Sequence, residues 1–243
     1  MLTDNQQAQP GIYGLYTSQP RDIWYSGATF AQFLAPPVIL DGNLNANMAN
    51  VGIPGGSGDY RWFMWAGMPV GRITATNKFR NSIIGLSTAT NTNSTTLTAS
   101  TATVSEVNRL IGLAGGNINL TLVGPPTNTG AVASAAVTAS AASGTSITLT
   151  GGPGATYVAG SIIMPADGSQ TIAGILAEDR GVALVDSLFN RVDAQTDRIA
   201  IGGGTINTGL IVNYPTLAVL QTWLKSQITT YCPSLTFLDN QVV

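Results

Sequence analysis

The chain contains no histidine, and only 9% of its 243 residues carry a formal charge. In an ordinary soluble domain about a quarter of the residues are charged. Glycine, threonine, alanine, serine and asparagine take that place here, yet no apolar run approaches the roughly 18–20 residues of a membrane span. The composition therefore predicts a protein that works by forming contact surfaces, without a membrane as its partner.

The missing histidines remove most catalytic chemistry. No Ser-His-Asp or Cys-His arrangement can form, and no imidazole can bind a metal ion. A mechanism based on two carboxylates, as in glycosidases, stays open. We interpret the candidate acids as solvated surface residues, and Asp193 and Asp197 as too sparse for a calcium site, so we expect no enzyme activity, no cofactor and no metal. These acids are Asp167, Glu178, Asp179, Asp186, Asp193 and Asp197.

The charges and the single cysteine exclude further classes. Ten basic residues are scattered along a chain of net charge −2, which argues against nucleic-acid binding. A loose basic group at 72–80 is interpreted as a solvated strand face. Cys232 cannot form an intrachain disulfide, and we expect it to be a small buried residue. The N-terminus lacks the pattern of a signal peptide, so we expect synthesis in the cytoplasm of a host cell.

Residues 1–59 are rich in proline and aromatic residues without a regular period, which predicts an extended N-terminal arm. Such an arm would be unfavourable in water, so it either folds back on its own domain or lies along a partner. Residues 52–59 are glycine-rich and are interpreted as a hinge. The candidate partner-binding side chains of the arm are Tyr13, Tyr16, Trp24, Tyr25, Phe30 and Phe33.

Residues 60–87 and 156–243 predict a β-rich core that ends in a helix. Trp62 and Trp65 are interpreted as core or oligomer-interface residues rather than a platform for sugar stacking. Pro215 is expected to begin the C-terminal helix, followed by an apolar stripe to about residue 230. Residues 202–204 are expected to form a bend. Strands are expected at 61–65, 70–76, 79–86, 157–164, 171–177, 182–185, 198–201 and 210–212.

Residues 88–155 predict an inserted lobe of the βαβ type. Thr103 and Glu106 match a capping box at the start of a helix that ends at Gly115. A strand is expected at 117–123, and a hairpin around Gly144. The whole chain is thus expected to be mainly β, in the sense of a β-rich α+β protein. It would have a compact β domain, the inserted lobe, two short helices and the N-terminal arm.

Two segments resemble the small head decoration, or capsid cement, proteins of lambda-type tailed phages. They are residues 65–79 (WAGMPVGRITATNKF) and residues 160–168 (GSIIMPADG), which continue to the AGIL of 173–176. The resemblance implies a mostly β homotrimer on the exterior of a virion, at local threefold positions. There it would clamp neighbouring subunits of the major capsid protein, with its arm adding strand-like pairing to a coat loop.

Three functions follow from these observations. The leading hypothesis is a structural protein that stabilises a phage capsid. The second is a tail, fibre or head–tail joining protein, because low charge and uncharged polar residues suit those parts equally well. The third is a carbohydrate-binding or carbohydrate-hydrolysing module that would use Trp62, Trp65 and the acids at 178–197.

Overall fold

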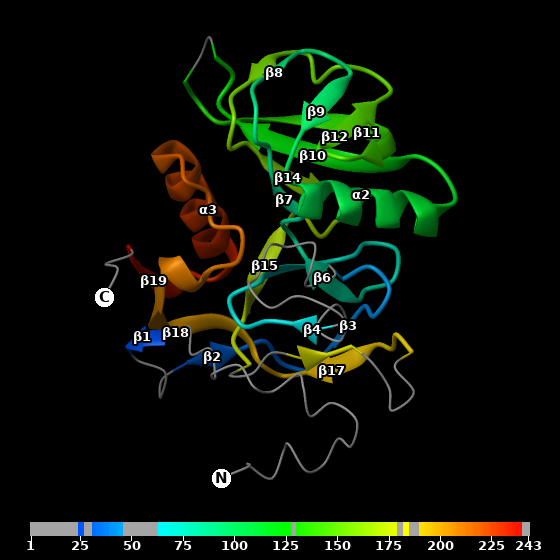
Figure 1. Cartoon of the computed structure of the whole chain (residues 1–243). Helices are drawn as coiled ribbons and strands as arrows, with labels where there is room; N and C mark the ends of the chain where they lie inside the picture. Colours follow the sequence, from blue (N-terminus) through cyan, green and yellow to red (C-terminus); the bar gives the residue numbers. More distant parts are fainter. Residues whose placement is uncertain are drawn as a thin grey trace, which may run out of the picture.

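The computed structural model describes residues 24–26, 31–45, 63–127, 130–178, 182–184 and 190–239. Of these, 42% lie in strands and 17% are helical, which confirms the mainly β class. Two curled sheets organise the chain: a lobe with helix α2 lies above, and a larger sheet with helix α3 at its side lies below (Figure 1). Neither described helix is long and apolar enough to cross a membrane.

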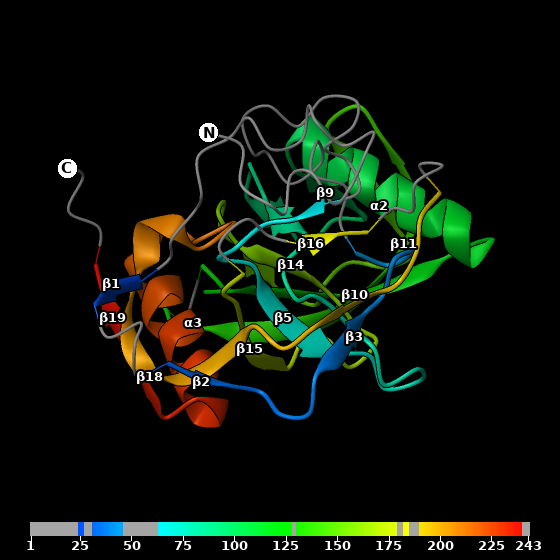
Figure 2. The same cartoon turned by 90° about the horizontal axis from the view of Figure 1, so that it is seen from below.

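The first sheet combines strands from both ends of the chain. Within the described residues its order is β1-β18-β15-β5-β6-β3-β17, and β2 and β19 also pair with β18. Seen from below, β2, β18, β15 and β5 cross the lower face, with α3 beside them (Figure 2). The bounds are β1 Trp24–Ser26, β2 Gln32–Phe33, β3 Val38–Leu40, β5 Pro69–Arg72, β6 Phe79–Asn81, β15 Ile172–Leu176, β17 Ala194–Thr196, β18 Ile199–Asn207 and β19 Ser234–Leu238.

Glycines allow close backbone packing where β5 pairs with β15. The two strands are antiparallel, with Gly174 opposite Val70. A Cβ atom on Gly71 would lie 2.1 Å from the carbonyl oxygen of Ser169, which is far too close for any side chain. Gly168, in the turn before β15, has a φ of 104° that an L side chain rarely adopts. These glycines therefore determine how the two segments pack together.

The second sheet forms the lobe and is antiparallel throughout, in the order β7-β14-β10-β11-β12-β9. Because β7 and β14 belong to it, the lobe extends over residues 84–165 and is wider than the expected 88–155. The βαβ expectation is wrong, since α2 joins two strands that do not run parallel. The bounds are β7 Gly85–Leu86, β9 Thr96–Thr98, β10 Ile118–Gly124, β11 Ala133–Ser143, β12 Ser146–Leu149 and β14 Ile162–Pro165.

Short connections complete the two sheets. The expected hairpin is present, with Ser143 opposite Ser146 and Gly144 at a φ of 60°. Two further pairs of short strands flank the sheets: β8 (Asn91–Thr92) with β13 (Thr156–Tyr157), and β4 (Phe63–Met64) with β16 (Val182–Ala183).

Helix α2 spans Thr101–Ala114 and begins two residues before the expected capping box. Its N-cap is Ser100, whose hydroxyl accepts a hydrogen bond from the Thr103 amide at 3.2 Å. Glu106 is fully buried and pairs with Arg109, so it does not close a capping box with Thr103. Gly115 ends the helix in the left-handed conformation, as expected.

The C-terminal region differs from the expected elements in three places. Helix α3 spans Ala218–Tyr231 with Leu217 as its N-cap, so Pro215 precedes the helix. Residues 202–204 lie inside β18 and do not form a bend, and the short strand expected at 210–212 is wrong. A 3-10 helix, Thr208–Leu210, ends where that strand was expected to begin, residues 211–212 form a bend and a turn, and β19 was not expected.

Apolar side chains form a core on each face of the first sheet and a third core in the lobe. Leu220, Leu224 and Ile228 of α3 pack on one face, while Leu40 and Leu176 belong to the other. In the lobe, α2 covers its sheet through buried residues such as Val104 and Val107. Strand β14 joins two of these cores, since Ile162 and Met164 face α3 whereas Ile163 faces the lobe.

Cys232 is fully buried beside β15, and burial raises the pKa of its thiol to about 11. The thiolate is the reactive form, so we expect native Cys232 to react with Ellman's reagent at pH 8 roughly a few hundredfold more slowly than an ordinary thiol of pKa near 8.5. Denatured protein should react at the ordinary rate. Rapid labelling of the native protein would contradict this burial.

Candidate functional site

The described part of the N-terminal segment lies in the first sheet. Trp24 is paired with Ile206 of β18, and Phe33 with Ala200 of the same strand. Strand β3 lies between β6 and β17, where Leu40 is opposite Ala194. Of the two alternatives for the arm over residues 1–59, the described residues 24–26 and 31–45 therefore follow the first: they fold back on their own domain.

The aromatic residues proposed for partner binding are not brought together as one described site. Phe33 is half-buried against the core beneath α3, and the guanidinium carbon of Arg198 lies 5.1 Å from its ring centre. Trp24 and Tyr25 lie in β1, which pairs with β18. The other candidates fall outside the described residues: Tyr13, Tyr16, Phe30 and Trp62.

Trp65 was expected to be a core or an oligomer-interface residue, and it lies in the core. It is 7% exposed and packs with Met64, Met68 and Val70. A ring in this position cannot stack on a sugar at the surface.

An exposed groove runs along the segment that enters β3. We call it the N-terminal groove; it has a volume of about 490 Å³ and is lined by residues 34–39, Arg72 and residues 76–79. Ile39 is 48% exposed, and Pro36 and Pro37 are exposed beside it. Apolar side chains exposed together on a short strand are typical of a contact surface.

The basic group at 72–80 divides into three different environments. Arg72 is exposed and donates to Asn77, Lys78 pairs with Asp193 at 2.7 Å, and Arg80 is 2% exposed. The expectation of one solvated face is therefore wrong for Arg80. Asp193 also accepts a hydrogen bond from the amide of Gly42 at 2.9 Å, and this bond, followed by Lys78, lowers its pKa.

A cluster of buried charges joins the lobe to the first sheet. Arg80 of β6 donates to Asp167 at 3.1 Å, so Asp167 is not the solvated residue expected. On α2, Arg109 binds Glu106 through Nε at 2.8 Å and Nη2 at 2.5 Å. Arg191 and Arg109 both donate to the carbonyl oxygens of residues 43 and 45. Through the hydrogen bonds of Arg109, the cluster thus holds residues 43–45 against α2.

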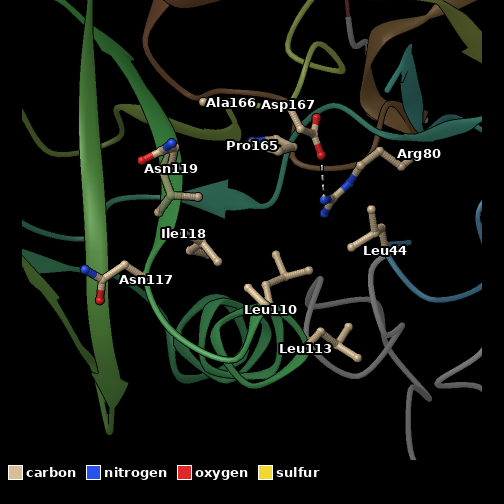
Figure 3. Close-up of a pocket in the computed structure, with 12 residues that line it drawn as sticks. Leu44, Arg80, Leu110, Leu113, Asn117, Ile118, Asn119, Pro165, Ala166 and Asp167 are labelled. Atoms are coloured by element: carbon tan, nitrogen blue, oxygen red, sulfur yellow. Dashed lines mark hydrogen bonds and ion pairs between the residues drawn. The ribbon is translucent and has the colours of Figure 1, made fainter. Parts of the chain in front are cut away.

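A pocket of about 330 Å³ lies between this charge cluster and the C-terminal end of α2. We call it the junction pocket. Its wall is mainly apolar, with Leu113 51% exposed at the rim and the Arg80–Asp167 ion pair at one end (Figure 3). No local sequence pattern predicts this pocket, because its lining residues come from distant parts of the chain. The lining residues are Leu44, Arg80, Leu110, Leu113, Ala114, Asn117, Ile118, Asn119, Leu120, Pro165, Ala166 and Asp167.

Comparisons with other proteins give no family for this chain. No protein-family model matches it, and neither the curated proteins nor the solved structures include a match. Over the residues that the structure describes, there is also no group of three or more acidic or cysteine side chains that could hold a metal ion. The function is therefore argued from the fold and the surfaces.

Proposed function

We propose that this protein is a structural component of a tailed-phage particle that decorates the exterior of the capsid. In this proposal it forms a homotrimer and stabilises the shell by binding neighbouring subunits of the major capsid protein. Its activity is contact between proteins, with no chemical step.

One observation carries the proposal. The two sequence segments that resemble decoration proteins contain β5 and β15, and these strands pair side by side in the first sheet. Their glycines are required by close backbone packing, at Gly71 against the carbonyl oxygen of Ser169 and at Gly174 against that of Ala200. Residues 65–79 and 173–176 of the resembling segments therefore pack together in the first sheet, whereas residues 162–165 form β14 of the lobe.

The N-terminal groove supplies a surface suited to a coat-protein segment. Its exposed apolar residues are Ala35, Pro36 and Pro37, just before the short strand β3, and Ile39 of that strand. Its charged residues Arg72 and Lys78 already have partners on their own chain. A surface of this kind gains free energy from apolar burial, and repetition of the contact in a trimer would strengthen binding.

The test measures binding to purified capsids that lack the protein. Ile39→Lys is expected to weaken co-sedimentation with capsids and to reduce the heat resistance that the wild-type protein confers, because it places a charge in the apolar contact. Val219→Lys is the matched control, since Val219 is 38% exposed on α3, away from the groove. A variant without residues 1–22 keeps β1, β2 and β3 and tests the preceding part of the arm separately.

Three results would count against the proposal. They are a stable monomer that never binds capsids, equal binding by the Ile39→Lys and wild-type proteins, and a low copy number in the particle. A copy number comparable with that of the coat protein supports decoration, whereas a single ring of copies supports the head–tail joining alternative.

A further inference from the structure

A second pocket, of about 400 Å³, lies where β5 and β15 meet the C-terminal end of α3. Its lining comes from these two strands, from the connections next to them and from Tyr231, the last residue of α3. We call it the Tyr231 pocket. Figure 2 shows β5 and β15 side by side, with α3 next to them. The volume is within the range of small-molecule sites.

Two tight turns hold the polar groups of the Tyr231 pocket in place. In the first turn, Asn77 has a φ of 60°, and its amide donates to the carbonyl oxygen of Ile73 at 2.9 Å. In the second turn, the amide of Thr171 donates to the carbonyl oxygen three residues earlier, at 3.1 Å. The amide of Thr74 joins the two turns, since it donates to the carbonyl oxygen of Asp167 at 2.9 Å. Polar groups that are fixed before binding lose little entropy when a ligand binds.

Arg72 gives the pocket a positive charge. Its Nε and Nη2 atoms both donate to Oδ1 of Asn77, so the side chain is oriented and Nη1 can donate to a ligand. Among the described residues, no carboxylate forms an ion pair with Arg72. The carboxylate of Asp167, close in the sequence to the second turn, is bound to Arg80 and Ser169.

Tyr231 adds an aromatic surface to the pocket. Its side chain is 55% exposed, although it lies at the end of a helix whose inner face is buried. An exposed tyrosine ring packs well on a partly apolar ligand surface, such as the C–H groups on one face of a pyranose ring. The hydroxyls of Thr74 and Thr171 also line the pocket, and each can donate and accept a hydrogen bond. Such groups complement the hydroxyls of a sugar.

The charges favour an acidic ligand over a neutral one. Arg72 carries a full positive charge, whereas the C-terminal end of α3 contributes about half a negative charge. The pocket is therefore positive overall. A simple anion would pair with Arg72 but would leave the ring of Tyr231 and the threonine hydroxyls without contacts.

We propose that the Tyr231 pocket binds a pyranose sugar that carries a carboxylate, such as a uronic acid. The carboxylate pairs with Arg72, one face of the sugar ring packs on Tyr231, and the sugar hydroxyls form hydrogen bonds with Thr74 and Thr171. This site is independent of the proposed capsid role. Arg72 also lines the N-terminal groove, but Tyr231 does not, so substitutions at Tyr231 and Ile39 test the two surfaces separately.

Titration of the ¹⁵N-labelled full-length protein, followed by NMR chemical shifts, tests the proposal with three probes. They are methyl glucuronide, methyl glucoside and cyclohexanecarboxylate. Methyl glucuronide is expected to bind about three- to tenfold more tightly than either of the others, because only it combines the carboxylate with the sugar hydroxyls. The largest shift changes should occur at residues 72–77, 168–173 and 231.

Paired variants locate the site. Tyr231→Ala should weaken binding of methyl glucuronide about three- to tenfold, whereas Tyr231→Phe keeps the ring and should retain the affinity. Leu113→Ala is the matched control, since it shortens another side chain that is about half exposed, at 51%, outside the pocket. Arg72→Gln should remove the preference for the glucuronide over the glucoside, and Arg198→Gln, at a second exposed arginine, should leave it unchanged.

Four results would overturn the proposal. No binding of methyl glucuronide, or unchanged binding by Tyr231→Ala, would exclude the site. Equal affinities for the glucuronide and the glucoside would exclude the role of Arg72. Equal affinities for the glucuronide and cyclohexanecarboxylate would show a site for acidic groups in general, including those of peptides. Ile39→Lys should bind the glucuronide as the wild-type protein does, whatever its effect on capsid binding.

Discussion

Asp167→Ala is expected to lower the free energy of unfolding by about 3–5 kcal/mol, because it leaves the buried guanidinium of Arg80 without its carboxylate partner. Arg80 lies just before the chain enters the lobe, and Asp167 lies just after it returns. Their ion pair therefore holds the two ends of the lobe together. Chemical denaturation monitored by circular dichroism measures the loss.

Two further variants test this explanation. Removing both charges, in Arg80→Met with Asp167→Ala, should give a protein more stable than Asp167→Ala alone, since no unpaired charge then remains buried. Asp197→Ala is the surface control. Its pair with Arg198 is 3.6 Å long, and both side chains are more than half exposed, so a change below about 1 kcal/mol is expected. A loss below about 1 kcal/mol for Asp167→Ala would refute the role of the pair.

Gly71→Ala is expected to destabilise the protein by about 1–3 kcal/mol or more, because the added methyl group meets backbone that cannot move independently. Its Cβ atom would lie 2.1 Å from the carbonyl oxygen of Ser169 and 2.5 Å from that of Thr171. The pairing of β5 with β15 must then open. Thermal unfolding should show a clear decrease in melting temperature.

Gly112→Ala is the matched control for this substitution and has the opposite expected sign. Gly112 lies inside α2, and nothing lies within 4 Å of the position of an added Cβ atom. Alanine should therefore stabilise the helix by about 1 kcal/mol, through its higher helix propensity. If both glycine variants changed the free energy of unfolding by the same amount, close backbone packing would not explain why a glycine is needed at position 71.

Elements with a strong local pattern were predictable from the sequence. The apolar stripe of α3 contains Leu220, Leu224 and Ile228, and all three are buried. The turn at Gly144 and the helix end at Gly115 follow from residues that tolerate a positive φ. The start of α2 was placed wrongly because Ser100 and Thr103 are both good N-caps, and local rules do not separate them.

The long-range pairings were beyond a local analysis. Strands β1 and β2 pair with β18 near the other end of the chain, and β2 and β1 themselves show no regular alternation. Arg80 and Asp167 are 87 residues apart, so their pairing leaves no local signal. The junction pocket could not be predicted for the same reason, since it depends on how α2 is placed against the first sheet.

The pairing of β1 and β2 with β18 has a consequence for synthesis of the chain on the ribosome. The lobe contains its own hairpins and helix, so it can fold as soon as residue 165 has emerged. The first sheet must wait for β18, and its N-terminal strands are exposed until then. Unpaired strands of this kind are prone to aggregate, and slower translation before β18 should therefore reduce the yield of soluble protein.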